Sequence, residues 1–175
     1  ELNLLTYLTI AENLSFESLP SRRGLVDRGE LRRRAERLLK EVGLDAAPDT
    51  PVEDLGIAQM QLVEIARALV NAPKFLLLDE PFAGVDVATE RAIIALLKEL
   101  KSDGKTCVVV QHDLQTVPSY FDYVVLLNMR VVDAGPIQAV FTEANLKKTY
   151  GGKLTVLSEI GELVRKRRIP FREKY

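Results

Sequence analysis

The chain has 175 residues, of which 47% are hydrophobic and 28% are charged, and its formal net charge at pH 7 is −1. This is the composition of a globular protein with enough apolar material for one core or two small ones. A net charge this close to zero gives no overall attraction to nucleic acid or anionic lipid, so we expect no nucleic-acid partner.

The single cysteine, Cys107, excludes an intramolecular disulfide and a cysteine-based zinc cluster. Its position in an apolar segment predicts a small buried side chain. No apolar run approaches the ~20 residues that a membrane-spanning helix needs, and no signal peptide is evident. We therefore expect a cytoplasmic protein.

The first half of the chain predicts two helices. Residues 1–13 show no obvious helix cap and are consistent with a frayed terminal helix. Residues 30–42 place their apolar side chains on one helical stripe, and Gly43 follows as a C-terminal stop. Three glutamates interrupt the arginines of this helix, which favours a solvated, ion-paired face over a basic binding patch.

The second predicted helix begins near Ile57 and buries a stripe of apolar residues, namely Leu62, Ile65, Ala66 and Leu69. Ahead of it, Thr50 and Glu53 have the spacing of a capping box. Unpaired backbone N–H groups and the positive end of the dipole collect at the first turn of a helix. Gly56, Ala58 and Gln59 are therefore candidates for facing a phosphate group.

Residues 75–78 are four consecutive apolar residues that run into Asp79 and Glu80. This pattern predicts a strand buried on both faces of a parallel sheet, with two acids at its carboxyl end. In open α/β sheets, ligands bind at that end of the strands. Considered alone, the pattern also fits a buried strand followed by a solvated acidic turn.

The next residues predict a strand–helix–strand unit. Asp86 is placed to cap a helix over residues 87–101, and an apolar strand follows over residues 106–110. Such a connection is expected to be right-handed, with the two strands parallel. Residue His112, which follows the second strand, is then expected at the same sheet edge as the two acids that follow the first.

The rest of the chain predicts smaller elements. We expect a helix over residues 114–120 capped by Asp113, a hairpin over residues 123–132, a short helix that starts at Gly135, and an amphipathic helix over residues 154–168.

Four motifs in order resemble the ATP-binding cassette (ABC) ATPases: a signature motif at residues 55–59, a Walker B strand with a catalytic glutamate, a D-loop at residues 83–86, and a switch histidine. The usual signature is Leu-Ser-Gly-Gly-Gln, and here Gly56 replaces the serine and Ala58 the second glycine. The resemblance implies an α/β fold, namely the C-terminal half of a P-loop NTPase (RecA-like) core with a helical signature subdomain.

The resemblance also implies the roles of individual residues, with ATP and Mg²⁺ as cofactors. Glu80 would polarise the attacking water, and His112 would contact the γ-phosphate, so both are catalytic candidates. Asp79 would orient Mg²⁺. The nucleotide-binding candidates are the signature and D-loop residues Gly56, Ile57, Ala58, Gln59 and Asp86.

The resemblance divides the chain into three parts. Residues 1–72, a helical signature subdomain, resemble sugar-importer cassettes, whereas residues 73–152, the Walker B half, resemble manganese- and zinc-importer cassettes; residues 153–175 form a C-terminal helix and tail. A recombined or designed hybrid and a divergent relative explain this mixture equally. The implied partners are transmembrane permease subunits and a second cassette subunit, with a location at the membrane through the permease.

No phosphate-binding Walker A motif, Gly-x-x-x-x-Gly-Lys-Ser/Thr, occurs in the sequence, since Gly24 and Gly29 have the spacing but are followed by Glu30 and Leu31. We therefore expect an ATP-hydrolysing subunit of a metal-ion or sugar importer, represented by its Walker B half and inactive when isolated. A non-hydrolysing interaction module and a truncated or hybrid cassette without nucleotide chemistry are the alternatives.

Overall fold

The computed structural model describes residues 4–16, 18–22 and 24–151. The described residues form two compact units, unit 1 up to residue 110 and unit 2 from residue 111. The amphipathic helix expected over residues 154–168 lies outside the described residues. In the part of the chain that is described, no helix has the length and apolar character to cross a membrane.

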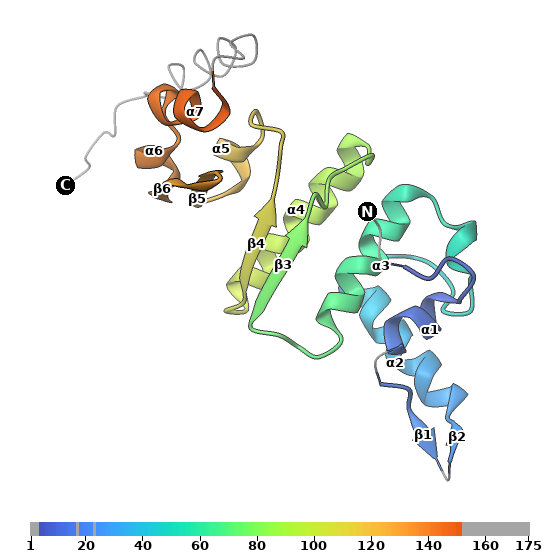
Figure 1. The fold of residues 1–175 in the computed structure, drawn as a ribbon. Helices are drawn as coiled ribbons and strands as arrows, with labels where there is room; N and C mark the ends of the chain where they lie inside the picture. Colours follow the sequence, from blue (N-terminus) through green and yellow to red (C-terminus); the bar gives the residue numbers. More distant parts are fainter. Residues whose placement is uncertain (1–3, 17, 23, 152–175) are drawn as a thin grey trace, which may run out of the picture. The chain divides into compact units, whose positions relative to one another are not determined.

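The first part of unit 1 is a cluster of three helices that contact one another: α1 (Ile10–Ser15), α2 (Arg28–Glu41) and α3 (Ile57–Leu69) (Figure 1). A small antiparallel hairpin, β1 (Ser21–Arg22) and β2 (Leu25–Val26), connects α1 to α2. A single 3₁₀ turn, η1 (Val52–Asp54), precedes α3. The predicted stripe of α2 is buried, and Gly43 ends the helix with a φ of +68°.

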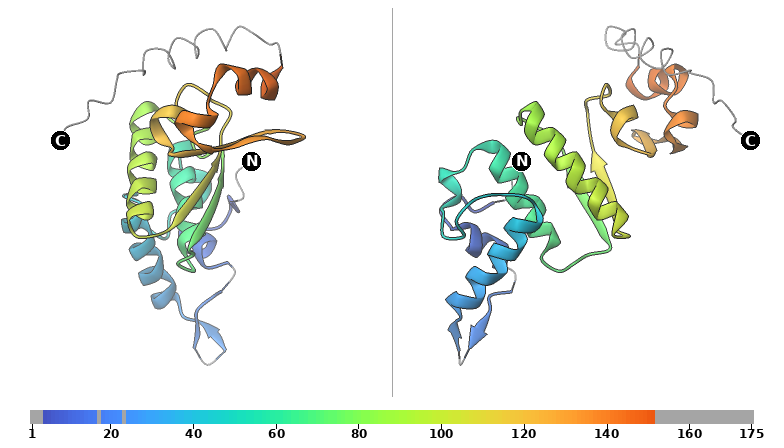
Figure 2. Two further views of the ribbon diagram at one scale, coloured as in Figure 1. Left: turned by 90° about the vertical axis from the view of Figure 1, so that its left-hand side faces the viewer. Right: turned by 180° about the vertical axis from the view of Figure 1, so that it is seen from behind.

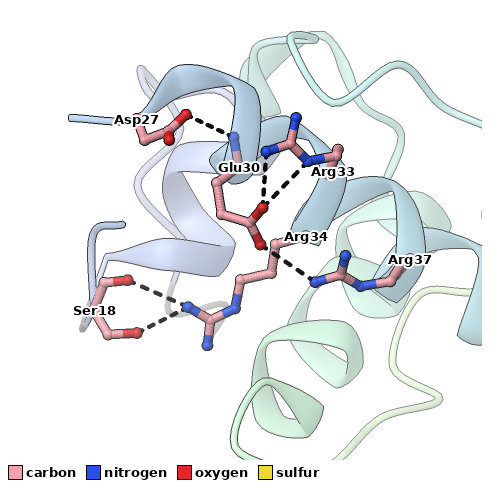
Figure 3. A network of polar contacts seen from close by, with 6 residues as sticks. All are labelled: Ser18, Asp27, Glu30, Arg33, Arg34 and Arg37. Atoms are coloured by element: carbon pink, nitrogen blue, oxygen red, sulfur yellow. Dashed lines mark hydrogen bonds and ion pairs between the residues drawn. The ribbon is translucent and has the colours of Figure 1, made fainter. Parts of the chain in front are cut away.

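The arginine-rich face of α2 is ion-paired, as predicted (Figure 3). Glu30 accepts hydrogen bonds from Arg33, with the Nη2 atom at 3.0 Å, and lies 3.6 Å from Nη2 of Arg37. Arg34 donates to the backbone carbonyl and to the hydroxyl of Ser18, at 3.3 and 3.0 Å. These exposed pairs contribute little stability, on the order of 0–1 kcal/mol each.

The start of α1 is capped, although no cap was recognised in the sequence. Thr9 Oγ1 accepts from the backbone N–H of Glu12 at 3.3 Å, and the Glu12 carboxylate accepts from the N–H of Thr9 at 2.9 Å, which forms a capping box. The buried Asn13 side chain also connects α1 to the preceding segment, because its amide accepts a hydrogen bond from the Leu5 N–H and donates one to the Leu5 carbonyl.

The capping box predicted at Thr50 and Glu53 does not form. Pro51 lies at the N-cap of η1, and no side chain caps that turn. Instead, the N–H of Glu53 donates to the carbonyl of Thr6 at 2.9 Å, and Val52 donates to Leu8 at 3.0 Å. Long-range backbone pairing therefore takes the groups that a local cap would have used.

The second part of unit 1 is a parallel two-stranded sheet, β3 (Phe75–Asp79) and β4 (Thr106–Val110), joined by α4 (Val87–Ser102). The predicted strand–helix–strand unit is confirmed, with Asp79 opposite Val110 in the register. Figures 1 and 2 show α4 along one face of these strands. The predicted apolar face of α4 is buried at Ile93, Ile94, Leu97 and Leu100.

Burial of β3 on both faces was expected, and in the described chain it occurs on one face only. Leu76 and Leu78 are buried, whereas Phe75 and Leu77 are 57% and 63% exposed. Alternate side chains of a strand point to opposite faces, so a single covering layer buries every second residue. Cys107 on β4 is half-buried rather than buried, and burial raises the pKa of its thiol.

In the described part of unit 2, residues 111–151, there are two strands and three helices: α5 (Val117–Tyr120), β5 (Tyr123–Asn128), β6 (Arg130–Pro136), α6 (Ile137–Val140) and α7 (Glu143–Tyr150). The predicted hairpin is confirmed, and its second strand continues to Pro136. The core of this unit gathers Leu114, Val117, Leu126, Ile137, Val140, Phe141 and Leu146.

Two helices of unit 2 differ from the sequence-based expectation. Residues 114–116 form a turn instead of the start of a helix, and the Asp113 carboxylate accepts from the N–H of Gln115 within that turn. The helix α7 was not predicted, although the Thr142 hydroxyl caps it by accepting from the N–H of Asn145 at 3.3 Å.

The capping box at α1 provides a stability prediction for the full chain. We expect Thr9→Ala to lower the free energy of unfolding by about 1 kcal/mol, because the substitution removes a side-chain cap. Thr9→Ser keeps the capping hydroxyl and should retain most of that stabilisation. Thr6→Ala, at an exposed position whose role is a backbone carbonyl, is the control and should change less than about 0.5 kcal/mol. Urea denaturation measures all three, and equal values for Thr9→Ala and Thr6→Ala would contradict the cap.

Candidate functional site

The candidate site lies at the carboxyl end of β3. Asp79 is the last residue of this strand and is exposed there. The pairing with β4 extends one residue further, because the N–H of Glu80 donates to the carbonyl of Val110 at 3.0 Å. The structure therefore brings the two predicted acids to the end where both parallel strands finish, which is where α/β sheets bind ligands.

Glu80 has an unusual backbone conformation. Its φ is +45°, in the left-handed region, which costs a residue with a Cβ about 1–2 kcal/mol. The chain turns sharply here, and the Glu80 carbonyl accepts from the N–H of Ala83 at 3.0 Å. Sequence reasoning points the other way, because a residue before a proline, here Pro81, normally takes an extended backbone. Strain of this kind clusters at functional positions.

Asp86 caps α4, as predicted. Its Oδ1 atom accepts from the backbone N–H of Thr89 at 2.7 Å. The hydrogen bonds from Thr89 hold the pKa of the Asp86 carboxyl below its ordinary value, so the group is a carboxylate at neutral pH. Its contact with a nucleotide stays a prediction.

The signature segment forms the first turn of α3. Gly56 is the N-cap residue, and its N–H donates to the Gln59 side-chain oxygen at 3.1 Å. A Cβ added at Gly56 would meet only that oxygen, at 3.9 Å, so a serine fits at this position. Of the four signature candidates, Gly56 and Ile57 are exposed, and Ala58 and Gln59 are half-buried.

Ile57 and the loop of residues 83–86 lie against each other, a contact that the sequence does not reveal. Gly84 has a φ of +71°, and a Cβ built on it would lie 3.3 Å from the Cγ2 atom of Ile57. Ile57 occupies the third place of the signature, where the usual residue is glycine. The structure thus joins two motifs that are separated by 25 or more positions in the chain.

A cleft between α3 and β3 was also missed. It has a volume of about 410 Å³, and its lining includes Gln61, Glu64, Arg67, Leu77, Asp79 and Pro81. Gln61 and Glu64, which are three residues apart on α3, both line this cleft. Only the tertiary packing of a helix against a strand creates it, so no local sequence signal could have predicted it. The cleft gives Asp79 a polar neighbourhood on one side.

His112 belongs to the second compact unit, whereas Asp79 and Glu80 belong to the first. It follows the last residue of β4 by two positions and is exposed. Its catalytic role therefore stays a prediction that rests on its place in the chain.

The acids of the site suit Mg²⁺ only when substrate phosphates and water supply its other ligands. Among the described residues there is no group of three or more histidine, cysteine, aspartate or glutamate side chains that would hold a metal ion alone. Mg²⁺ commonly binds through one or two carboxylates together with substrate phosphates and water. Asp79, exposed at the strand end, supplies a ligand of that kind.

Comparison with known proteins supports the motif-based interpretation. The family model described as "ABC transporter" matches residues 1–83. The manganese transport system ATP-binding protein MntB of Bacillus subtilis (strain 168) is 50% identical over 125 residues, which are 71% of this chain and 50% of MntB. The chain belongs to the ABC transporter ATPases. The zinc transport system ATP-binding protein TroB of Treponema pallidum (strain Nichols) is 49% identical over 122 residues, 70% of this chain and 46% of TroB.

Solved structures of ABC cassettes confirm the α/β fold class. The dimeric post-hydrolysis structure of the cassette MJ0796, bound to ADP and Pi, matches with a TM-score of 0.64 and 34% identity, covering 78% of this chain and 60% of that one. The cassette cbiO1 from Clostridium perfringens, part of the ABC transporter complex cbiONQ, matches with a TM-score of 0.65 and 31% identity, covering 93% and 63%.

The chain spans about half the length of the curated relatives that it matches. The division at residues 72 and 152 and the resemblance of the first part to sugar importers stay predictions.

The lowered pKa of Asp86 gives a pH prediction. Its carboxylate stabilises the fold at pH values above the unfolded-state pKa of 3.8, and this contribution is lost as the pH falls through the lower folded-state pKa. We expect Asp86→Ala to lower the melting temperature by a constant amount above pH ~5, and by less below the unfolded-state value. Asp86→Asn, which caps without titrating, is the control. A gap between Ala and wild type that stays the same at low pH would contradict the assignment.

Proposed function

We propose that this chain is the signature and Walker B portion of an ATP-hydrolysing ABC importer subunit whose cargo is a metal ion. The observation that carries the proposal is the pair of acids at the shared end of β3 and β4, with Glu80 anchored to Val110 and turned into the left-handed region. The names of relatives favour a metal cargo, since they describe manganese, zinc and chelated-iron transport. A sugar is the second candidate cargo, because the sequence of residues 1–72 resembles sugar-importer cassettes.

The chemistry assigned to the two acids follows from what phosphoryl transfer requires. The attacking water needs a proton acceptor or orienting group, and the phosphate charge needs neutralisation. We assign the first task to Glu80. Asp79 would hold Mg²⁺, which, when bound, neutralises charge on the phosphate oxygens. One carboxylate cannot readily serve both tasks, so two adjacent acids suit the reaction.

The signature helix supplies the third element of the proposal. Backbone N–H groups at the start of a helix favour an anion, and α3, with 13 residues, carries a full helix dipole. We infer that its first turn, residues 56–59, faces the γ-phosphate of ATP held by a second cassette. The dimeric state of MJ0796 with ADP and Pi supports this arrangement. His112 would donate a hydrogen bond to the γ-phosphate of the ATP on which Glu80 acts.

The proposed partners are a second cassette subunit and a membrane permease. The relative cbiO1 is part of a transporter complex, which supports an equivalent association for this chain. We infer a position on the cytoplasmic side of the membrane, reached through the permease. The exposed apolar face of β3, with Phe75 and Leu77, would be covered in a complete cassette by its phosphate-binding half.

The role of Glu80 is testable in a complete cassette that carries this chain. We expect Glu80→Gln to leave ATP binding nearly unchanged and to reduce turnover by about 10²-fold or more, because the carboxylate acts mainly in the transition state. Glu99→Gln, an exposed acid on α4, is the matched control and should retain turnover. His112→Ala should behave like Glu80→Gln. Near-normal turnover of Glu80→Gln would remove this residue from the proposed role.

The role of the signature turn is tested by restoring the usual serine. If a hydroxyl donor is lacking at the phosphate, Gly56→Ser in a complete cassette that carries this chain should tighten ATP-driven dimerisation by about 0.5–1.5 kcal/mol. A serine at an N-cap also stabilises its helix, by only a few tenths of a kcal/mol relative to glycine. Sedimentation with ATP, alongside denaturation without it, separates the two effects. A gain in stability alone would show that the hydroxyl caps α3 and that backbone groups suffice for the phosphate.

A further inference from the structure

The loop between Glu80 and Asp86 makes one close approach to the start of α3. At Gly84 the backbone has a φ of +71°, and a Cβ placed there would lie 3.3 Å from Cγ2 and 3.8 Å from Cδ1 of Ile57. Because 3.3 Å is tighter than ordinary carbon–carbon contact, a side chain at position 84 would press on Ile57, so the isoleucine closely approaches the loop backbone at Gly84. Glycine is required here both by the conformation and by the neighbour.

Ile57 has no major part in the core. It is 54% exposed, whereas the later apolar residues of α3, such as Val63 and Ile65, are almost completely buried. Its side chain branches at Cβ, which restricts it to one main rotamer in a helix and gives its methyl groups a fixed position. A stiff, half-exposed side chain resting on a glycine positions a loop more than it stabilises a fold.

The loop that Ile57 touches is fixed at both of its ends. At one end, Glu80 is anchored to Val110 by its N–H. At the other end, Asp86 is held to Thr89 as the cap of α4. The middle of the loop, at Gly84, is where the first turn of α3 reaches it. A displacement of that turn would therefore displace the loop segment that begins at Glu80.

We propose that the contact between Ile57 and Gly84 couples the signature turn to the loop that carries Glu80, with Ile57 as a positioning residue for hydrolysis. This inference rests on the proposed function, because it needs Glu80 to act on ATP. An anion that binds at the first turn of α3 changes or restricts the position of the Ile57 side chain. The position of Ile57 in turn determines the conformation of the loop of residues 80–86. The contact thus links phosphate binding at one motif to the geometry of the other.

The β-branch of Ile57 gives a sharp test in the complete cassette. Valine keeps the branch with less volume, and leucine keeps the volume without the branch. We expect Ile57→Leu and Ile57→Ala to reduce kcat by about fivefold to tenfold with KM for ATP unchanged, and Ile57→Val to reduce kcat less than either, because small displacements of a catalytic group are costly. Leu25→Ala, at a residue 76% exposed on β2, is the control and should change neither constant.

A double-mutant cycle tests whether the two residues act on each other. Gly84→Ala alone should reduce kcat, since its Cβ meets Ile57 and its backbone is strained. Ile57→Ala removes the obstacle, so the double variant should exceed the product of the two single effects by about threefold or more. Thermal unfolding of each variant shows whether the change is in the fold or in turnover.

The outcomes separate the inference from the proposed function. Equal kcat for Ile57→Val, Ile57→Leu and wild type, or strictly multiplicative effects in the cycle, would overturn the coupling while Glu80→Gln still abolishes turnover. If Glu80→Gln turns over like wild type, the proposed function fails first. Should Ile57→Ala not fold, the valine and leucine pair, which differ by a single methylene group, still decides the question.

Discussion

The hydrogen bond from the N–H of Glu80 to the carbonyl of Val110 is the constraint on which the site depends. It carries the parallel pairing one residue beyond Asp79 and so fixes the point at which the chain leaves the sheet. A left-handed residue at that point costs about 1–2 kcal/mol, and one such hydrogen bond contributes a net of about 0.5–1.5 kcal/mol. Pro81, the next residue of the turn, is buried, so strand pairing and burial together hold a conformation that Glu80 would not adopt alone.

Much of the fold could be predicted because the burial pattern of its longer elements is periodic. The helices α2, α3 and α4 and the strands β3 and β4 were expected within a few residues of their observed bounds. The errors arise where long-range contacts decide. The backbone of Glu53 pairs with Thr6 and not with a local cap. The spacing of Thr9 and Glu12 fits a capping box and could have predicted this cap, but it was missed. The cap at Thr142 lacks the acidic partner of that motif and gives a weaker sequence signal.

The candidate site was predictable in its residues and not in its geometry. Motif spacing identified Asp79, Glu80 and Asp86, and the structure confirms the strand end for the first two and the helix cap for the third. The backbone of Glu80, the cleft beside α3, and the approach of Ile57 to its loop depend on how a helix lies against a strand. No spacing along the chain contains that information, because the packing of separate elements determines it.

Alkylation of the half-buried Cys107 thiol on β4 can report on the pairing of β3 with β4. Thiolates, not thiols, react with alkylating reagents, and the raised pKa of Cys107 keeps it in the protonated form at neutral pH. Since the chain has no other cysteine, the rate of its alkylation reports on one position, opposite Leu76 in the register. Slow labelling marks a covered sheet, and faster labelling marks a sheet whose strands have separated, so the chain contains its own reporter of the strand pairing that supports the site.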